Sequence, residues 1–313
     1  MIDVALVGTG GMMPLPGRFL SSMIARIKGG MVLFDCGEGT QVSLRILGWG
    51  FKNIDIICLT HYHGDHVSGL PGLFLTMAHA ERKESVVLIG PPGLRKVVGS
   101  LCVIARDLPF ELKFYETDKN GGLIYQNSAF QISTLPLHHR THCVAFGLEL
   151  LRRGKFDPQR AKALDLPVHY WGILQKQVDE KIEYNGREYT SDMVLGPKRR
   201  GLKLVFCTDT RPVAGLADFA LEADLFICEG MYGDDEKFEK AVAYKHMTFS
   251  EAAKIARDAN VSELWLTHFS PSMPDPQNYL KNATEIFSNT KTGKDRMTTT
   301  LQFKDEIYGG VHG

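Results

Sequence analysis

The sequence predicts an α/β fold in which two β-sheets pack face to face and helices cover their outer surfaces. Short apolar runs typical of buried strands occur in both halves of the chain, with segments of helical spacing between them. Hydrophobic residues make up 44% and charged residues 23% of the 313 residues, as in globular proteins. No apolar stretch approaches the ~18 residues of a membrane-spanning helix. We therefore expect one large domain covering residues 1–313.

The first half alternates strands and helices. Gly29 and Gly30 separate two apolar runs, which predicts a hairpin. Helices are expected where apolar residues recur at helical spacing, and strands where they are continuous. The expected strands are 4–7, 23–27, 31–34, 54–59 and 86–89, and the expected helices are 40–47 and 67–80.

The second half repeats this style, with strands expected at 130–135, 204–207, 225–228 and 264–266. The last three strands each run directly into polar residues. A helix is expected to begin after Thr248, because Thr248 and Glu251 have the spacing of a capping box.

Residues 152–200, here called the arm, interrupt the pattern and are too long for an ordinary connection. We interpret them as an inserted, protruding substrate-binding segment.

The chain has 36 basic and 36 acidic residues, so its net charge is zero and it is no general nucleic-acid binder. Residues 151–203 nevertheless hold twelve Lys and Arg against seven Asp and Glu. Six of these cations are candidate phosphate contacts, with a merely solvated surface as the alternative: Arg152, Arg153, Lys155, Lys198, Arg199 and Arg200.

Cysteine usage and the N-terminus indicate a cytoplasmic protein. The six cysteines form no CxxC pair and fall mostly in apolar runs, so we expect buried thiols in a reducing compartment. The first residues lack the basic segment of a secretory signal. We expect no association with a membrane.

The segment Thr60-His61-Tyr62-His63-Gly64-Asp65-His66 is the strongest chemical signal. It follows a buried strand, and residues two apart in an extended segment point the same way, so His61 and His63 can hold one ion. A turn at Gly64 lets Asp65 and His66 face a second ion. Two metals about 3.5–4 Å apart can share a hydroxide and clamp a phosphoryl group. The alternative, ordinary surface histidines, is disfavoured because a six-residue window of this composition should hold only about 0.2 histidine, against three here.

A dinuclear site needs further ligands, and strand ends supply them. Asp209 and His268 each follow a strand at the position where His61 leaves its own. The remaining candidates come after the strand at 130–135, where spacing alone does not choose among His138, His139 and His142.

Several segments together resemble the metallo-β-lactamase superfamily and, within it, the ribonuclease Z family, over nearly the whole chain. The resemblance implies an αββα sandwich with a projecting arm. It also implies an endoribonuclease whose metal-bound hydroxide cleaves precursor tRNA at its 3′ end and leaves a 3′-hydroxyl on the tRNA. The segments are GTGG (8–11), FDCGEGTQ (34–41), THYHGDH (60–66), GKFDP (154–158), TDT (208–210), HMT (246–248) and LTHFSP (266–271).

The resemblance also implies a ligand set for two divalent ions, with zinc expected and manganese or iron possible. One ion would be held by His61, His63 and His139, and the other by Asp65, His66 and His268, with Asp209 bridging. His139 is chosen because the small and aromatic pair at 145–146 stands where the family has Gly-Tyr. His142 is the fallback.

Catalytic roles follow from the same resemblance. His246 matches the family's proton donor for the leaving 3′-oxygen, and it precedes a helix N-terminus, which favours phosphate. Glu229 resembles the residue that orients this histidine. Asp65 would also accept a proton from the attacking water.

The chain departs from the family after the first strand. A loop of the form Pro-x-Lys-x-Arg-Asn is common there, whereas only Pro14 and Arg18 remain here, which leaves the CCA preference open. A phosphodiesterase for small or cyclic nucleotides is therefore the first alternative, and a non-catalytic RNA-binding module the second. The resemblance further implies a homodimer in which the arm of one subunit serves the site of the other.

Overall fold

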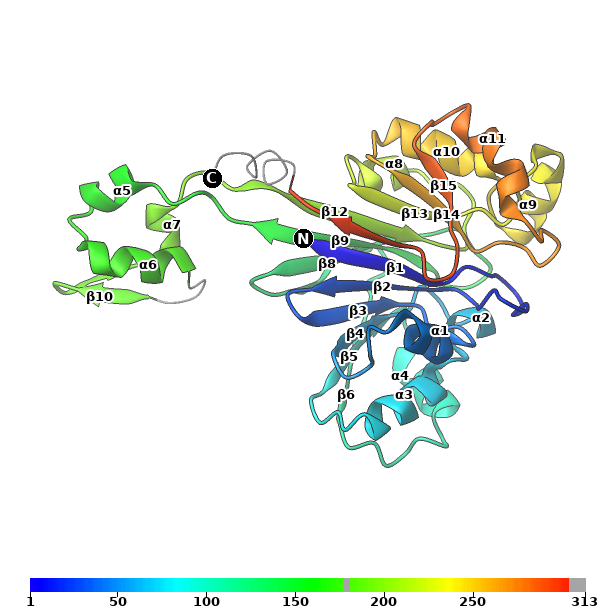
Figure 1. Cartoon of the computed structure of the whole chain (residues 1–313), viewed down its shortest axis with the longest axis horizontal. Helices are drawn as coiled ribbons and strands as arrows, with labels where there is room; N and C mark the ends of the chain where they lie inside the picture. The colour runs from blue at the N-terminus through cyan, green and yellow to red at the C-terminus, as the bar shows by residue number, and fades with distance from the viewer. Residues whose placement is uncertain (177–180, 304–313) are drawn as a thin grey trace.

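The computed structural model describes residues 1–176 and 181–303. Within this part of the chain two seven-stranded mixed sheets pack against each other, and a separate two-stranded ribbon lies in the arm. Figure 1 shows the two large sheets between two groups of helices, with the arm extending to one side. The predicted αββα sandwich is therefore confirmed.

The first sheet has the order β16-β1-β2-β3-β4-β5-β6. Strands β2 and β3 form the hairpin predicted around Gly29, and β3 to β6 run parallel. The strands of this sheet are β1 (Ile2–Gly8), β2 (Ser22–Ile27), β3 (Gly30–Phe34), β4 (Ile54–Cys58), β5 (Val86–Gly90), β6 (Leu112–Glu116) and β16 (Thr298–Leu301).

The second sheet has the order β15-β14-β13-β12-β9-β8-β7. Strands β12 to β15 are parallel, so their carboxyl ends meet at one edge, where the polar residues expected in the site follow. Its strands are β7 (Gly122–Gln126), β8 (Phe130–Pro136), β9 (Val144–Arg152), β12 (Arg199–Cys207), β13 (Leu225–Glu229), β14 (Leu264–Thr267) and β15 (Thr290–Thr292).

Helices cover the outer face of each sheet. Apolar residues of α1 (Thr40–Leu47), α3 (Leu70–His79) and α4 (Leu94–Leu101) pack on the first sheet. Those of α8 (Leu216–Ala220), α10 (Phe249–Asp258) and α11 (Leu280–Thr284) pack on the second. Shorter elements complete the body: α2 (Gly64–Val67), η1 (Asp235–Lys237), α9 (Phe238–Tyr244) and η2 (Pro276–Tyr279).

The layer between the sheets is built from aromatic and branched side chains of both. Phe34 of the first sheet contacts Phe146 and Phe206 of the second, with ring centroids 5.8 and 5.9 Å apart. These rings are almost completely buried. Burial of this kind contributes most of the free energy of folding and holds the polar edge in a fixed position.

The expected helix at 67–80 is only partly correct. A short helix α2 ends at Val67, and α3 begins at Leu70. The break has a physical cause: the backbone N–H of Gly69 donates to the carbonyl of Cys36, and a Cβ there would meet the Gly37 carbonyl at 2.3 Å. The short helix is what turns Asp65 and His66 towards the site.

The arm has its own secondary structure and a small apolar cluster around Leu174 and Val194. Figure 1 shows it beyond the ends of β9 and β12, away from the sandwich. Its elements are α5 (Pro158–Ala163), α6 (Val168–Lys176), β10 (Ile182–Tyr184), β11 (Arg187–Tyr189) and α7 (Ser191–Val194).

All six cysteines lie in the described residues, buried and unpaired, as the sequence predicts. No helix in the described ranges has the length and apolar character required to cross a bilayer.

Candidate metal centre and active site

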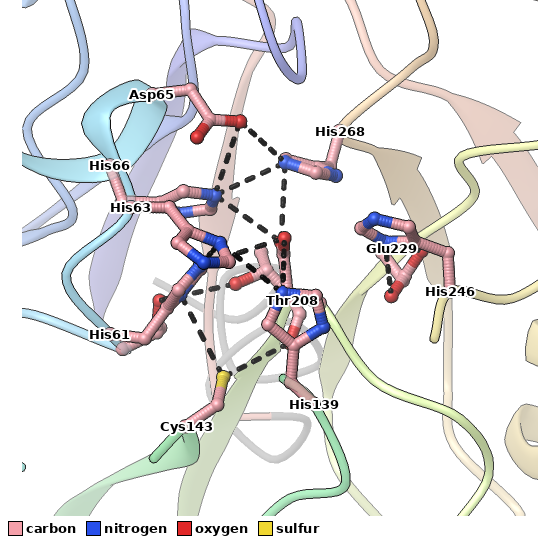
Figure 2. A network of polar contacts seen from close by, with 12 residues as sticks. His61, His63, Asp65, His66, His139, Cys143, Thr208, Glu229, His246 and His268 are labelled. Carbon is pink, nitrogen blue, oxygen red and sulfur yellow. Dashed lines mark hydrogen bonds and ion pairs between the residues drawn. The ribbon is translucent and has the colours of Figure 1, made fainter. Parts of the chain in front are cut away.

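The site lies where strands of both sheets end. His61 follows β4, Asp209 follows β12 and His268 follows β14, and all three side chains are buried. Asp209 and His268 have φ angles of 49° and 57°. This left-handed conformation is costly for residues other than glycine and is typical of functional positions held by their surroundings. Figure 2 shows the imidazoles of both strand groups pointing towards one another.

One set of donor atoms belongs to His61, His63, His139 and Asp209. His63 Nδ1 lies 3.0 Å from His61 Nε2 and 3.3 Å from His139 Nε2. Oδ2 of Asp209 lies 3.6 Å from Nε2 of His61 and 3.7 Å from Nε2 of His139. The four atoms therefore face a common centre.

A second set belongs to Asp65, His66 and His268, joined by the other oxygen of Asp209. The Nε2 atoms of His66 and His268 are 3.1 Å apart, and each is 3.2 Å from Oδ1 of Asp209. Oδ2 of Asp65 lies 3.6 Å from Nε2 of His66 and 3.3 Å from Nε2 of His268. Asp209 thus directs one oxygen at each set.

These residues fit two metal ions. Ligand atoms about 2.1 Å from a tetrahedral ion lie about 3.4 Å from one another, close to the spacings in both sets. Oδ1 of Asp209 is buried and, among the described residues, makes no hydrogen bond although two ring nitrogens lie near it. An imidazole carries only one N–H when neutral, so converging ring nitrogens satisfy each other poorly and suit cations well.

The outer nitrogens of three imidazoles are held by other groups. Nδ1 of His66 donates to Asp35 at 2.7 Å, Nδ1 of His61 lies 3.1 Å from Oγ1 of Thr60, and Nδ1 of His139 lies 3.2 Å from the carbonyl of Lys245. Each contact leaves Nε2 as the inward, ligating atom. Such partners orient metal-binding histidines and raise their basicity.

The carboxylates of the site remain ionised. Burial raises the pKa of Asp65, but the hydrogen bond with His268 and the charge of His66 outweigh it and hold the pKa below its usual range. Burial also raises the pKa of Asp209. The positive charges of His268 and His66 outweigh this effect, so the pKa of Asp209 is lowered as well. Both residues are therefore available as anionic ligands.

His246 and Glu229 form a pair beside the second donor set. Nδ1 of His246 lies 3.2 Å from Oε2 of Glu229, which is completely buried at the end of β13. The carboxylate also accepts hydrogen bonds from the backbone N–H groups of Thr210 and Met247 at 2.5 and 3.1 Å. Burial lowers the pKa of His246, but Glu229 outweighs it and raises the pKa to about 9. Figure 2 shows the imidazole of His246 and the carboxylate of Glu229 facing each other beside the donor sets, an arrangement that favours the protonated imidazole.

Comparison with known proteins identifies the family. The chain is 51% identical to ribonuclease Z of Lachnoclostridium phytofermentans over 97% of this chain and 99% of that protein. It is 50% identical to ribonuclease Z of Lachnospira eligens over 98% of this chain and 100% of that protein. The chain belongs to the ribonuclease Z family. It is therefore a metal-dependent hydrolase of the nuclease class, and the expectation of a non-catalytic RNA-binding module is set aside.

Solved structures agree with this membership of the ribonuclease Z family. The human tRNase Z, short form, superposes with a TM-score of 0.70 at 25% identity, covering 96% of this chain and all of that one. A metallo-β-lactamase fold protein of Bacillus subtilis, with a TM-score of 0.67 and 18% identity over 95% of this chain and 98% of that one, shares the fold. A family model described as Anti-Pycsar protein Apyc1 matches residues 2–104, about a third of the chain.

The structure brings together every residue predicted for the site of this ribonuclease Z family member. His139 lies in the first donor set, whereas His142 is exposed and outside both sets, and His138 contacts Nζ of Lys245 instead. Arg18 lies outside both donor sets and donates to the carbonyls of Met273 and Pro274.

Sequence reasoning missed residues that hold the ligands in place. Asp35 was part of a family segment but had no assigned role, although a buried acid at a strand end was a usable signal. Arg211 donates to the carbonyl of His246 at 2.5 Å and pairs with Glu251 of the capping box. Met12 donates its backbone N–H to Asp65 at 2.7 Å. The backbone passes this close because Gly11 has no side chain, since a Cβ there would lie 2.7 Å from the His268 ring.

A cavity of about 350 Å³ opens onto the centre and is here called the His246 cavity. Residues of both donor sets line it, together with aromatic and basic side chains. The lining residues are Met12, His63, Asp65, His139, Arg140, Asp209, Met231, Tyr232, Lys240, Tyr244, His246, His268 and Ser270.

Proposed function

We propose that this chain is a zinc-dependent endoribonuclease that removes the 3′ trailer of precursor tRNA and leaves a 3′-hydroxyl on the tRNA. The observation that carries the proposal is Asp209, whose two oxygens face two donor sets next to the His246–Glu229 pair. Full-length similarity to proteins named ribonuclease Z supports the choice of substrate.

The donor atoms favour zinc. Imidazole nitrogens with carboxylate oxygens are zinc's usual ligands, although manganese and iron accept the same groups. Two such ions supply a nucleophilic water at neutral pH and compensate the charge on a phosphoryl group. One ion would be held by His61, His63 and His139. The other would be held by Asp65, His66 and His268. Asp209 would contribute one carboxylate oxygen to each ion.

His246 and Asp65 are the residues that would donate and accept protons in the reaction. Glu229 holds Nδ1 of His246, so Nε2–H is the proton available for transfer. As the bond from phosphorus to the 3′-oxygen breaks, this proton passes to the oxygen and produces the 3′-hydroxyl. Oδ2 of Asp65 contacts His268 and the N–H of Met12, which leaves Oδ1 to accept the proton of the attacking water.

The arm suits recognition of folded RNA by shape and backbone. A cavity of about 650 Å³ at its base is lined by Arg152, Arg153, Lys198 and Arg199 together with uncharged and acidic groups. Of the six expected phosphate contacts, Arg200 instead pairs with Asp224 at 3.1 Å. We assign residues 152–200 to substrate binding and residues 1–313 to one domain from which the arm projects.

A homodimer would give the arm a role at a neighbouring site. Figure 1 shows the arm extending beyond the strand ends opposite to those that carry the metal donors. An arm placed in this way can reach a second subunit more readily than its own centre. The buried, unpaired cysteines support a cytoplasmic location for this assembly.

A phosphodiesterase for small or cyclic nucleotides remains the second candidate. Two features favour it. The 14–19 loop keeps only Pro14 and Arg18 of the loop pattern common in the family, and the Arg18 guanidinium donates to two backbone carbonyls. The arm argues against it, because a small nucleotide does not need an additional binding segment of this size.

Cleavage of a 3′-extended precursor tRNA tests the proposal. Wild type is expected to cut beside the discriminator nucleotide, and Asp65→Ala is expected to lose this activity together with bound metal. A wild-type protein that binds two metals and hydrolyses a cyclic nucleotide, but leaves the precursor intact, would overturn the tRNA assignment.

A further inference from the structure

Tyr232 has an unused hydrogen-bond donor in the wall of the His246 cavity. The residue is only 7% exposed, yet it lines the cavity. Within the described residues its hydroxyl makes no hydrogen bond and is not among the buried polar atoms that lack a partner, so it is open to the cavity and can bind a ligand there. Burial raises the pKa of Tyr232, so the hydroxyl stays protonated and can donate.

The backbone of Tyr232 is fixed to the loop that carries His246. Its N–H donates to the carbonyl of Met247 at 3.3 Å, and its carbonyl accepts from the N–H of Phe249 at 3.0 Å. The Tyr232 and His246 rings lie edge to face, with centroids 6.5 Å apart. Whatever the hydroxyl binds is therefore positioned relative to the proton donor.

Two cations lie on the same wall. Nζ of Lys240 is 5.8 Å from the Tyr232 ring centroid, and the guanidinium of Arg140 is 5.0 Å from that of Tyr244. In the part of the chain that the structure describes, neither cation is paired with a carboxylate. Aromatic rings next to unpaired cations suit a nucleotide, because its base can stack on a ring and its phosphate charge can be neutralised by a cation.

The direction of the reaction assigns this wall to one side of the cut. The leaving 3′-oxygen belongs to the nucleotide on the 5′ side of the scissile phosphate, and His246 gives its proton to that oxygen. The nucleotide must therefore approach from the side of His246, where Tyr232 and Lys240 lie.

We propose that Tyr232 is a substrate-binding residue whose hydroxyl donates a hydrogen bond to the 5′-phosphate of the nucleotide on the 5′ side of the cut. Lys240 and Arg140 neutralise the adjacent phosphates. This assignment rests on the proposed endoribonuclease function and identifies the part of the RNA that the cavity holds.

Tyr232→Phe tests the hydrogen bond because it removes only the hydroxyl. The variant is expected to lose about tenfold in kcat/KM on precursor tRNA, as for one lost hydrogen bond to a charged group. Bis(p-nitrophenyl) phosphate has only the scissile phosphate and no neighbouring one, so its hydrolysis and the metal content are expected to stay at the wild-type level. Tyr115→Phe is the matched control, since Tyr115 is 44% exposed on β6 and lies outside the cavity lining.

Lys240→Met, compared with Lys237→Met on the neighbouring η1, tests the cation in the same way. The first is expected to raise KM for precursor tRNA, and the second to leave it unchanged. Equal kcat/KM of Tyr232→Phe and wild type on RNA, or equal losses on both substrates, would overturn the assignment. A wild type that does not cleave the precursor at all would instead refute the proposed function.

Discussion

Nδ1 of His66 lies 2.7 Å from Oδ2 of Asp35, and both side chains are completely buried. The same carboxylate accepts hydrogen bonds from the backbone N–H and the hydroxyl of Thr60. It thereby connects the strand end before His61 to the helix that carries His66. Asp35 has a φ angle of 55°, which places it with Asp209 and His268 among the left-handed strand-end residues.

Replacing this carboxylate is expected to weaken the centre without removing a ligand. We predict that Asp35→Asn lowers metal affinity or activity about 10–100-fold, as is typical of groups that orient metal-binding histidines. Competition with a chelator, followed by zinc titration, measures the change. Asp107→Asn, at an exposed loop position, is the control. Unchanged zinc affinity of Asp35→Asn would show that His66 is oriented by other contacts.

The role of His246 can be separated from metal binding. His246→Ala and Glu229→Gln are predicted to lower kcat on precursor tRNA by about 10²–10⁴-fold, the usual contribution of a general acid. A p-nitrophenyl phosphodiester has a leaving group that needs no proton, so its hydrolysis should fall far less. Comparable losses on both substrates would contradict proton donation by His246.

Metal removal is predicted to destabilise the fold. Asp209 is 2% exposed, and without cations its ionised carboxylate and the converging imidazoles are poorly satisfied. Ions that bind only the folded state stabilise it by mass action. A chelator should therefore lower Tm, and added zinc should restore it. An identical Tm with and without chelator would argue against a metal at this site.

The arm is predicted to act on the site of a partner subunit. Replacing residues 152–200 by a short glycine linker should abolish cleavage of precursor tRNA and leave hydrolysis of a small phosphodiester. Mixing this variant with His61→Ala, which keeps its arm but lacks a ligand, should recover part of the tRNA activity. No recovery in a mixed dimer verified by mass would mean that each arm serves its own subunit.

The local parts of the fold and site were predictable from the sequence. His61, His63, Asp65 and His66 lie within one short segment after a continuous apolar strand, so their proximity required no knowledge of the tertiary fold. Asp209 and His268 were predictable from a second regularity, because parallel strands present their carboxyl ends at one edge.

The remaining parts depend on tertiary packing. His139 and His142 differ by three positions in a loop, and only its path past Lys245 shows which ring faces the centre. Asp35 reaches His66 because β3 pairs with β4, a relationship that no local pattern contains. The role of Arg211 likewise depends on the approach of the His246 loop to β12. Helix 67–80 was misjudged because a backbone contact between Gly69 and Cys36 interrupts it.

The metal content of wild type and Asp209→Ala tests the central claim most directly, since Asp209 joins the two donor sets. We predict two divalent ions per wild-type subunit by mass spectrometry of the purified protein, and loss of both ions in Asp209→Ala together with loss of precursor cleavage. A wild type with a single ion, or a variant that retains two, would contradict a centre bridged by Asp209.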